Sequence, residues 1–204
     1  NRYKDVVYAW DVVNEAIADG PAGIPCPYRD TRHYRLCGDE FIAKAFIFAH
    51  EADPEAELYY NDYSMGKPGK RDAVVRMIKD LKASGCRIDA VGMQSHNGCD
   101  YPDLKEYEET MKALVDAGVK INISELDVNM LPNPESFSGA DINQKYAGNP
   151  KMNPYVKGLP KQAEQLFNDR YMSFFKLYYK YKEHIDRVCT WGITDNDSRH
   201  NDRP

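Results

Sequence analysis

The sequence lacks both a long apolar run and a surplus of basic residues. No segment reaches the roughly 18 to 20 consecutive apolar residues that are needed to cross a bilayer, so no membrane span is expected. Lys and Arg number 27 against 32 Asp and Glu, which gives a net charge of -5. The basic residues are scattered, without the concentrated patch that binding to phosphates requires. Nucleic acid is therefore not expected as a partner.

The first residues also lack the pattern of a signal peptide. The chain opens with Asn1-Arg2-Tyr3-Lys4 rather than with a charged start followed by a hydrophobic stretch. We therefore expect a soluble chain whose export signal, if it is secreted, lies outside this sequence.

Cysteine is sparse. The chain has five cysteines, an odd number, and at 204 residues it is large enough to bury a core without disulfide bridges. Cys26 and Cys37 lie eleven positions apart in a loop rich in Gly and Pro. They fit three interpretations: unpaired loop thiols, a disulfide bridge, or metal ligands together with His33. The metal interpretation lacks a clear fourth ligand.

What the sequence does contain is a repeated alternation of short apolar strands and amphipathic helices, which is typical of a parallel sheet covered by helices. Polar or ionisable residues follow each strand, as in a (β/α) barrel whose site is built by the loops after the strands. Five strands do not close a barrel of eight, so the pattern predicts either an open doubly wound sheet or an incomplete barrel. Strands are expected at Val6–Val13, Glu57–Tyr60, Ala90–Met93, Lys120–Ile123 and Val188–Ile193. Helices are expected at about Glu40–Glu51, Arg71–Ser84, Asp103–Ala117 and Lys161–Glu183, and long loops at Asp19–Asp39 and Pro132–Pro160.

Two glutamates stand out because each directly follows a strand. Glu15 and Glu125 are 110 residues apart, which corresponds to three βα units of about 37 residues each. They are therefore expected to project into one pocket. A pair of carboxyl groups about 5 to 5.5 Å apart is the machinery of a retaining glycoside hydrolase. We expect the two carboxyl carbons to lie within about 6 Å of each other.

Five strand ends together resemble the fourth to eighth strands of the family 10 glycoside hydrolases, which are endo-1,4-β-xylanases. The resemblance covers nearly the whole chain and keeps the order of the family. The segments that carry it are Trp10-Asp11-Val12-Val13-Asn14-Glu15, Tyr60-Asn61-Asp62-Tyr63, Gly92-Met93-Gln94-Ser95-His96, Ile123-Ser124-Glu125-Leu126-Asp127 and Trp191-Gly192-Ile193-Thr194-Asp195.

The resemblance implies the fold and the domain: residues 1–204 would be the C-terminal part, strands 4 to 8, of a TIM (β/α)8 barrel. It also implies a role for each matching residue. Glu15 would be the acid/base and Glu125 the nucleophile, while Asn14 would donate a hydrogen bond to the sugar 2-hydroxyl next to the cleaved bond. The remaining implied residues are Gln94 and His96, which would orient the nucleophile and the sugar, Trp191 as part of the sugar platform, and Asp127, Asn61 and Tyr63 as supporting residues.

The sequence also departs from the family. A second tryptophan is expected after Ser198, but Arg199 stands there. The first three βα units are absent, so an N-terminal polypeptide is expected to complete the barrel, or the sheet is expected to leave apolar edges exposed. Some family members from gut bacteria carry a carbohydrate-binding insertion after the third strand. Cleavage or truncation at such an insertion would leave a chain that begins just before the fourth strand.

The expected function is therefore hydrolysis of β-1,4-xylosidic bonds in xylan or xylo-oligosaccharides, with retention of configuration and without a cofactor or metal. The expected location is secreted, cell-surface or periplasmic. Two alternatives remain open: another retaining β-glycanase of the same barrel clan, which Gln94-Ser95-His96 disfavours, and a non-catalytic half-barrel fragment or sugar-binding remnant.

Overall fold

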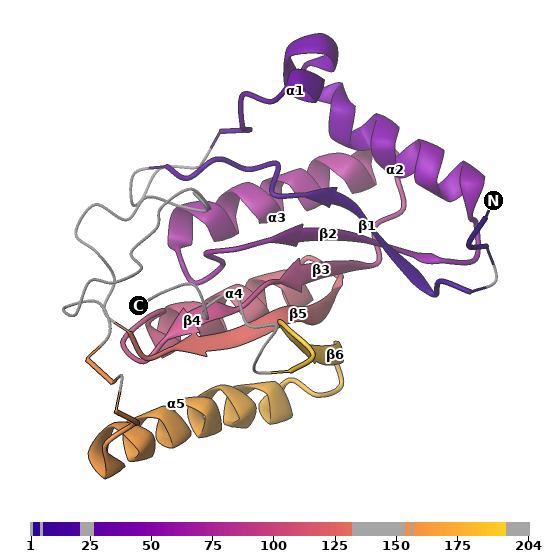
Figure 1. The fold of residues 1–204 in the computed structure, drawn as a ribbon. Coiled ribbons are helices and arrows are strands. Elements are labelled where there is room, and N and C mark those ends of the chain that lie inside the picture. Colours follow the sequence, from indigo (N-terminus) through magenta and orange to yellow (C-terminus); the bar gives the residue numbers. More distant parts are fainter. Residues whose placement is uncertain (1, 5, 21–26, 132–153, 156, 195–204) are drawn as a thin grey trace.

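The fold is a curved parallel sheet with helices packed on its outer side. The structure, a computed structural model, describes residues 2–4, 6–20, 27–131, 154–155 and 157–194. Figure 1 shows helices α2 to α5 arranged around the strands. The strands are β1 (Ala9–Asn14), β2 (Glu57–Asp62), β3 (Ala90–Met93), β4 (His96–Gly98), β5 (Lys120–Asn129) and β6 (Ile185–Thr190). The helices are α1 (Arg32–Cys37), α2 (Glu40–Ala52), α3 (Pro68–Ala83), α4 (Leu104–Asp116) and α5 (Lys161–Lys180).

Every pairing between the six strands is parallel, as the sequence predicts. The order is β1-β2-β3-β5, and both β4 and β6 also pair with β5. The third predicted strand, Ala90–Met93, is confirmed as β3. After Gln94-Ser95 the chain forms a further short strand, β4, where His96 pairs with Asp127. Ser95 has a positive φ of 64°, and this left-handed residue bends the chain between β3 and β4. The sequence-based count of five strands therefore becomes six, because the short strand β4 was not predicted.

Other boundaries also differ from the prediction. The fourth predicted strand, Lys120–Ile123, continues to Asn129 as β5. The first strand begins at Ala9 rather than Val6, and the last covers Ile185–Thr190 rather than Val188–Ile193. The last strand starts earlier because Ile121 donates its backbone N–H to His184 and so recruits the residues after α5 into the sheet. The predicted loop at 19–39 contains the helix α1, which was missed because it buries no residue and so has no apolar face to detect. The predicted loop at 132–160 lies almost wholly outside the described residues.

The core lies between the sheet and the helices. Ile42 and Phe46 of α2 are each 1% exposed, and α3 buries Val74, Met77, Ile78 and Leu81. Tyr107 of α4 packs edge-on against Phe174 of α5, with ring centroids 5.4 Å apart. This packing holds the C-terminal ends of the strands in a fixed arrangement, and those ends carry the residues predicted for the site.

The sheet ends at β1 and β6. In the described part of the chain, β1 pairs only with β2, and β6 only with β5. Large apolar side chains are exposed beside these strands: Tyr8 next to β1, and Val188 and Ile193 in and after β6. The predicted exposed apolar edges are therefore present.

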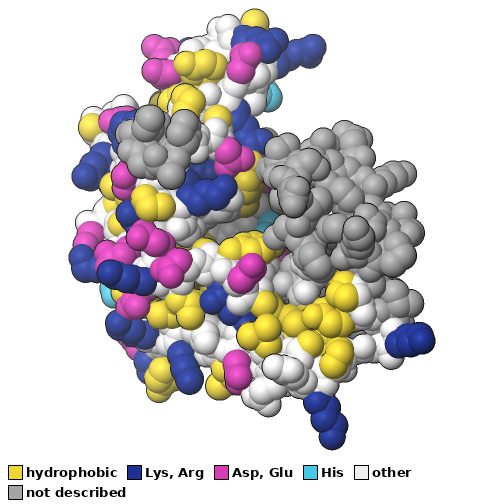
Figure 2. All heavy atoms as spheres, turned by 90° about the vertical axis from the view of Figure 1, so that its left-hand side faces the viewer, with side chains coloured by type: hydrophobic (Ala, Val, Ile, Leu, Met, Phe, Trp, Pro, Cys, Tyr) yellow, Lys and Arg dark blue, Asp and Glu magenta, His cyan; other side chains and the backbone are white. Residues whose placement is uncertain are grey.

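The C-terminal ends of the strands point to the left in Figure 1, and Figure 2 shows the molecule from that side, with acidic and basic side chains mixed over its described part. Over the described residues, no helix is long and apolar enough to span a membrane.

Candidate active site

Glu125 lies on β5 and has both carboxylate oxygens held by hydrogen bonds. The side-chain amide of Asn61, at the end of β2, donates to Oε1 over 2.8 Å. The other oxygen, Oε2, lies 3.1 Å from Nε2 of His96. These contacts fix the rotamer of the carboxylate, which a nucleophile needs if it is to attack along one line.

His96 lies between two carboxylates of the same strand. Its Nε2 faces Glu125, and its Nδ1 lies 3.1 Å from Oδ2 of Asp127. Glu125 and Asp127 are two positions apart on β5 and so project from the same face of the strand. Because both ring nitrogens have a carboxylate partner, the imidazole is held in one orientation beside Glu125.

Glu15 follows β1 in a left-handed backbone conformation, with φ of 55°. For a residue other than glycine such a conformation costs about 1 to 3 kcal/mol, and it is common at functional sites. Its backbone N–H donates to the carbonyl of Asn61 over 2.8 Å. Its carboxylate accepts a hydrogen bond from Gln94 Nε2 over 3.0 Å and lies 3.8 Å from the guanidinium of Arg29.

Three side-chain amides connect the two glutamates. Asn14 Oδ1 accepts from Asn61 Nδ2 over 3.0 Å and from Gln94 Nε2 over 3.3 Å. The same two donors bind Glu125 and Glu15. Since the oxygen of Asn14 faces these donors, its NH₂ group is directed elsewhere and can donate to a bound substrate. Glu15 and Glu125 therefore belong to one hydrogen-bonded site.

One contact differs from the sequence-based expectation. Gln94, expected to orient the nucleophile, contacts Glu15 and Asn14 instead. The side-chain amide that donates to Glu125 belongs to Asn61, which was expected only to support the site. Asn61 is itself fixed, because its Oδ1 accepts from Ser124 Oγ over 2.6 Å.

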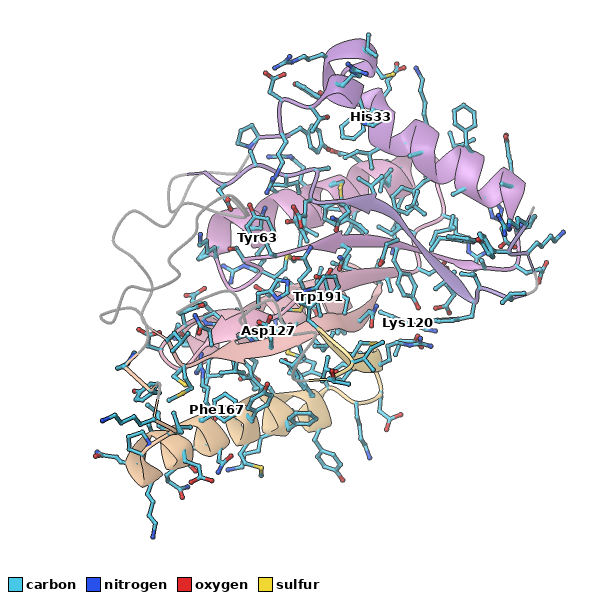
Figure 3. All side chains as sticks on the ribbon, in the orientation of Figure 1. His33, Tyr63, Lys120, Asp127, Phe167 and Trp191 are labelled. Carbon is cyan, nitrogen blue, oxygen red and sulfur yellow. The ribbon has the colours of Figure 1, made fainter. Side chains whose placement is uncertain are left out.

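The remaining predicted residues also lie at this end of the sheet. In Figure 3, Tyr63, Asp127 and Trp191 lie to the left of Lys120, which begins β5. Trp191 is 48% exposed and meets His96 edge-to-face, with ring centroids 6.0 Å apart. A half-exposed indole beside the carboxylates offers a flat apolar surface to a sugar ring.

Comparison with known proteins assigns this arrangement to a family. The sequence model of glycosyl hydrolase family 10 matches residues 1–204. The chain belongs to glycosyl hydrolase family 10.

The relatives of this family 10 chain include endo-1,4-beta-xylanase A of Xylanibacter ruminicola, which is 58% identical over 97% of this chain and 52% of the relative. An endo-1,4-beta-xylanase of Geobacillus stearothermophilus is 37% identical over 96% of this chain and 53% of the relative. A solved GH10 endoxylanase from a sugarcane soil metagenome matches with a TM-score of 0.90 and 44% identity, covering 98% of this chain and 57% of that one.

These likenesses confirm the predicted fold, an incomplete (β/α)8 barrel. The chain spans about half the length of these relatives.

Sequence reasoning missed two charged residues: Arg29, which lies beside Glu15, and Lys70, which is buried on α3. No local pattern predicts that Arg29 lies near Glu15. The backbone N–H of Arg29 donates to the carbonyl of Ala16 over 2.7 Å, and this bond brings its side chain to Glu15. Its guanidinium also donates to the hydroxyl of Tyr63, which in turn donates to Asp19 over 2.7 Å. Lys70 was detectable, because it shares the buried face of α3 with Val74, where a lysine is rarely found.

No metal centre is formed by the described residues, which contain no group of three His, Cys, Asp or Glu placed to hold an ion. His33 lies on α1, away from the site (Figure 3). Cys26 lies outside the described residues, as do Ser198 and Arg199, whereas Cys37 is exposed at the end of α1.

The amide contacts predict the effect of replacing Asn61. We expect Asn61→Ala to lower kcat/KM by about ten- to a hundredfold, the loss that follows from removing one or two hydrogen bonds to charged groups. The measurement is hydrolysis of xylo-oligosaccharides by a chain that carries the complete barrel. The matched control is Asn122→Ala on β5, whose buried Oδ1 has no partner among the described residues. Equal activity of the two variants would contradict the role of Asn61.

Proposed function

We propose that this protein hydrolyses internal β-1,4-xylosidic bonds by a retaining double displacement, with Glu125 as nucleophile and Glu15 as acid/base. The observation that supports this most strongly is the amide network that joins the two glutamates at the C-terminal end of one parallel sheet. It brings two carboxyl groups to one site, as glycoside hydrolysis requires. The expected separation of their carboxyl carbons, within about 6 Å, stays a prediction.

In the first step Glu125 Oε attacks the anomeric carbon while the bond to the leaving sugar breaks. Glu15 gives its proton to the departing glycosidic oxygen, which leaves as an alcohol. The NH₂ group of Asn14 donates to the 2-hydroxyl of the sugar at the cleaved bond, a contact that strengthens in the transition state. Trp191 supports the sugar ring.

In the second step a water molecule attacks the anomeric carbon and releases Glu125. Glu15, now ionised, takes a proton from that water and returns to its starting state. Two inversions at one carbon retain the β configuration.

The substrate assignment rests on the relatives, which are named as endo-1,4-beta-xylanases. We propose xylan and xylo-oligosaccharides as substrates and residues 1–204 as a partial catalytic domain, βα units 4 to 8. The complete barrel then includes an N-terminal polypeptide beside β1 and β6. Because xylan is a polymer too large to enter a cell, the enzyme is expected to act as a secreted, cell-surface or periplasmic protein.

The proposed function is tested with a panel of polysaccharides: xylan, a soluble cellulose and mannan. A chain with the complete barrel should release xylo-oligosaccharides of several lengths from xylan early in the reaction, as an endo-acting enzyme does, and little from the other two. Faster hydrolysis of cellulose or mannan would reassign the substrate. Hydrolysis of an aryl xylobioside by residues 1–204 alone is measured in parallel with the complete barrel. Turnover by residues 1–204 indicates a catalytic part, and no turnover indicates a sugar-binding remnant.

A further inference from the structure

A buried charged cluster lies behind Glu15. Lys70, in the first turn of α3, and Asp62, the last residue of β2, are 1% and 0% exposed, and their charged atoms lie 3.0 Å apart. Tyr60, also fully buried, donates its hydroxyl to Asp62. Burial raises the pKa of Asp62, and the Lys70 ammonium opposes that shift. None of these three groups takes part in the chemistry described above.

The cluster holds both backbone groups of Ile17. The N–H of Ile17 donates to the hydroxyl of Tyr60 over 3.2 Å, and its carbonyl accepts from Lys70 Nζ over 2.7 Å. Arg29 Nε adds a longer contact of 3.4 Å to the same carbonyl. The side chain of Ile17 is fully buried in the core. Ile17 is therefore fixed to β2 and to α3 at the same time.

Ile17 lies two residues after Glu15, whose backbone is in the left-handed region. The N–H of Glu15 is bound by Asn61 at the end of β2. Glu15 is thus held on one side by β2 and on the other by the fixed Ile17. A strained conformation persists only where its surroundings over-determine it, and these two anchors do so.

We propose that Tyr60, Asp62 and Lys70 are positioning residues that act through Ile17 to keep the carboxyl group of Glu15 in reach of the leaving oxygen. This proposal rests on the proposed function, in which Glu15 is the acid/base. A buried ion pair is a poor means of stabilising a fold, because removing two charges from water offsets their attraction. Two directional hydrogen bonds to the N–H and the carbonyl of one residue, in contrast, fix the path of the chain. Apolar side chains in the same space would not do so.

The test is Tyr60→Phe in a chain with the complete barrel. Phenylalanine keeps the ring in the core and removes the hydroxyl that binds Ile17 and Asp62. If the cluster positions the acid, kcat/KM for unactivated xylo-oligosaccharides should fall by about tenfold or more, since proton donation to the leaving group is lost in part. For 2,4-dinitrophenyl β-xylobioside, whose leaving group hardly needs a proton, kcat/KM should stay within about threefold.

Tyr59→Phe is the matched control. Tyr59 is the neighbouring residue of β2 and equally buried, but its hydroxyl binds Glu57 and Asp186 at the other end of the strand. Tyr59→Phe should change kcat/KM for both substrates by the same factor.

Lys70→Met is the second variant, because it removes the bond to the Ile17 carbonyl. The carboxyl group of Asp62 can then take up a proton, since burial already raises its pKa. Lys70→Met should show the same split between substrates as Tyr60→Phe.

The positioning role would be overturned if a folded variant, Tyr60→Phe or Lys70→Met, lost the same factor of kcat/KM on both substrates while the unaltered protein hydrolysed both. That result would leave the proposed function intact. An unaltered protein that hydrolyses neither substrate would overturn the proposed function and the positioning role with it. Circular dichroism of each variant establishes that it folds.

Discussion

Glu125→Ala is expected to abolish hydrolysis of every substrate, with a loss in kcat on the order of 10⁵-fold or more. Glu125 is the only group proposed to form the covalent glycosyl-enzyme intermediate, so no leaving group, however activated, restores the normal reaction. The measurement is the hydrolysis of an aryl xylobioside and of xylan by a chain with the complete barrel. The matched control is Glu106→Ala, which removes a carboxylate of α4 that pairs with Arg71 and takes no part in the amide network of Glu15 and Glu125.

Azide gives the Glu125 variant a distinctive product. With the carboxylate removed, azide can attack the anomeric carbon in place of Glu125 while Glu15 still assists departure of the leaving group. One displacement inverts the configuration, so the product should be an α-glycosyl azide. A β-azide from Glu125→Ala would contradict the assignment of Glu125.

Glu15→Ala should behave differently and depend strongly on the leaving group. An aryl xylobioside with a good leaving group needs little protonation and should still form the intermediate, which then accumulates because no base activates the water. Xylan, whose leaving group is a sugar alcohol, should be hydrolysed about 10² to 10⁴ times more slowly than by the unaltered protein. A burst of phenol release followed by a slow phase is the measured sign of this stall.

Azide should restore turnover to Glu15→Ala, because this anion needs no base. The product here should be the β-glycosyl azide, since it forms by two inversions. If both glutamate variants gave the same anomer, or if azide restored neither, the roles of Glu15 and Glu125 would have to be abandoned.

The fold was largely predictable because alternating strands and helices leave a periodic pattern in the sequence. The parts that were missed have physical reasons. The short strand β4 was missed because it follows a bend at Ser95, which depends on a left-handed residue, and serine gives no local sign of that bend. The helix α1 buries nothing, and the last strand is placed by a hydrogen bond from Ile121, a residue more than sixty positions away.

The candidate site was predictable where residues follow strands. Asn14, Glu15, Gln94 and Glu125 could be placed at one end of a parallel sheet because all parallel strands end there. Which amide reaches which carboxylate was not predictable, since it depends on side-chain reach across neighbouring strands. The result is that Asn61 binds Glu125 and Gln94 binds Glu15.

The central claim is that Glu125 of this family 10 chain forms a covalent bond to the sugar, and trapping that bond tests it most directly. A 2-deoxy-2-fluoro xylobioside with a dinitrophenyl leaving group slows both steps through its electron-withdrawing fluorine, while the good leaving group still allows the first. Digestion and mass analysis of the inactivated protein, with its barrel complete, should then show one fluorosugar on the peptide that contains Glu125. A label on Glu15 or on another residue, or hydrolysis with inversion and no label, would contradict the account.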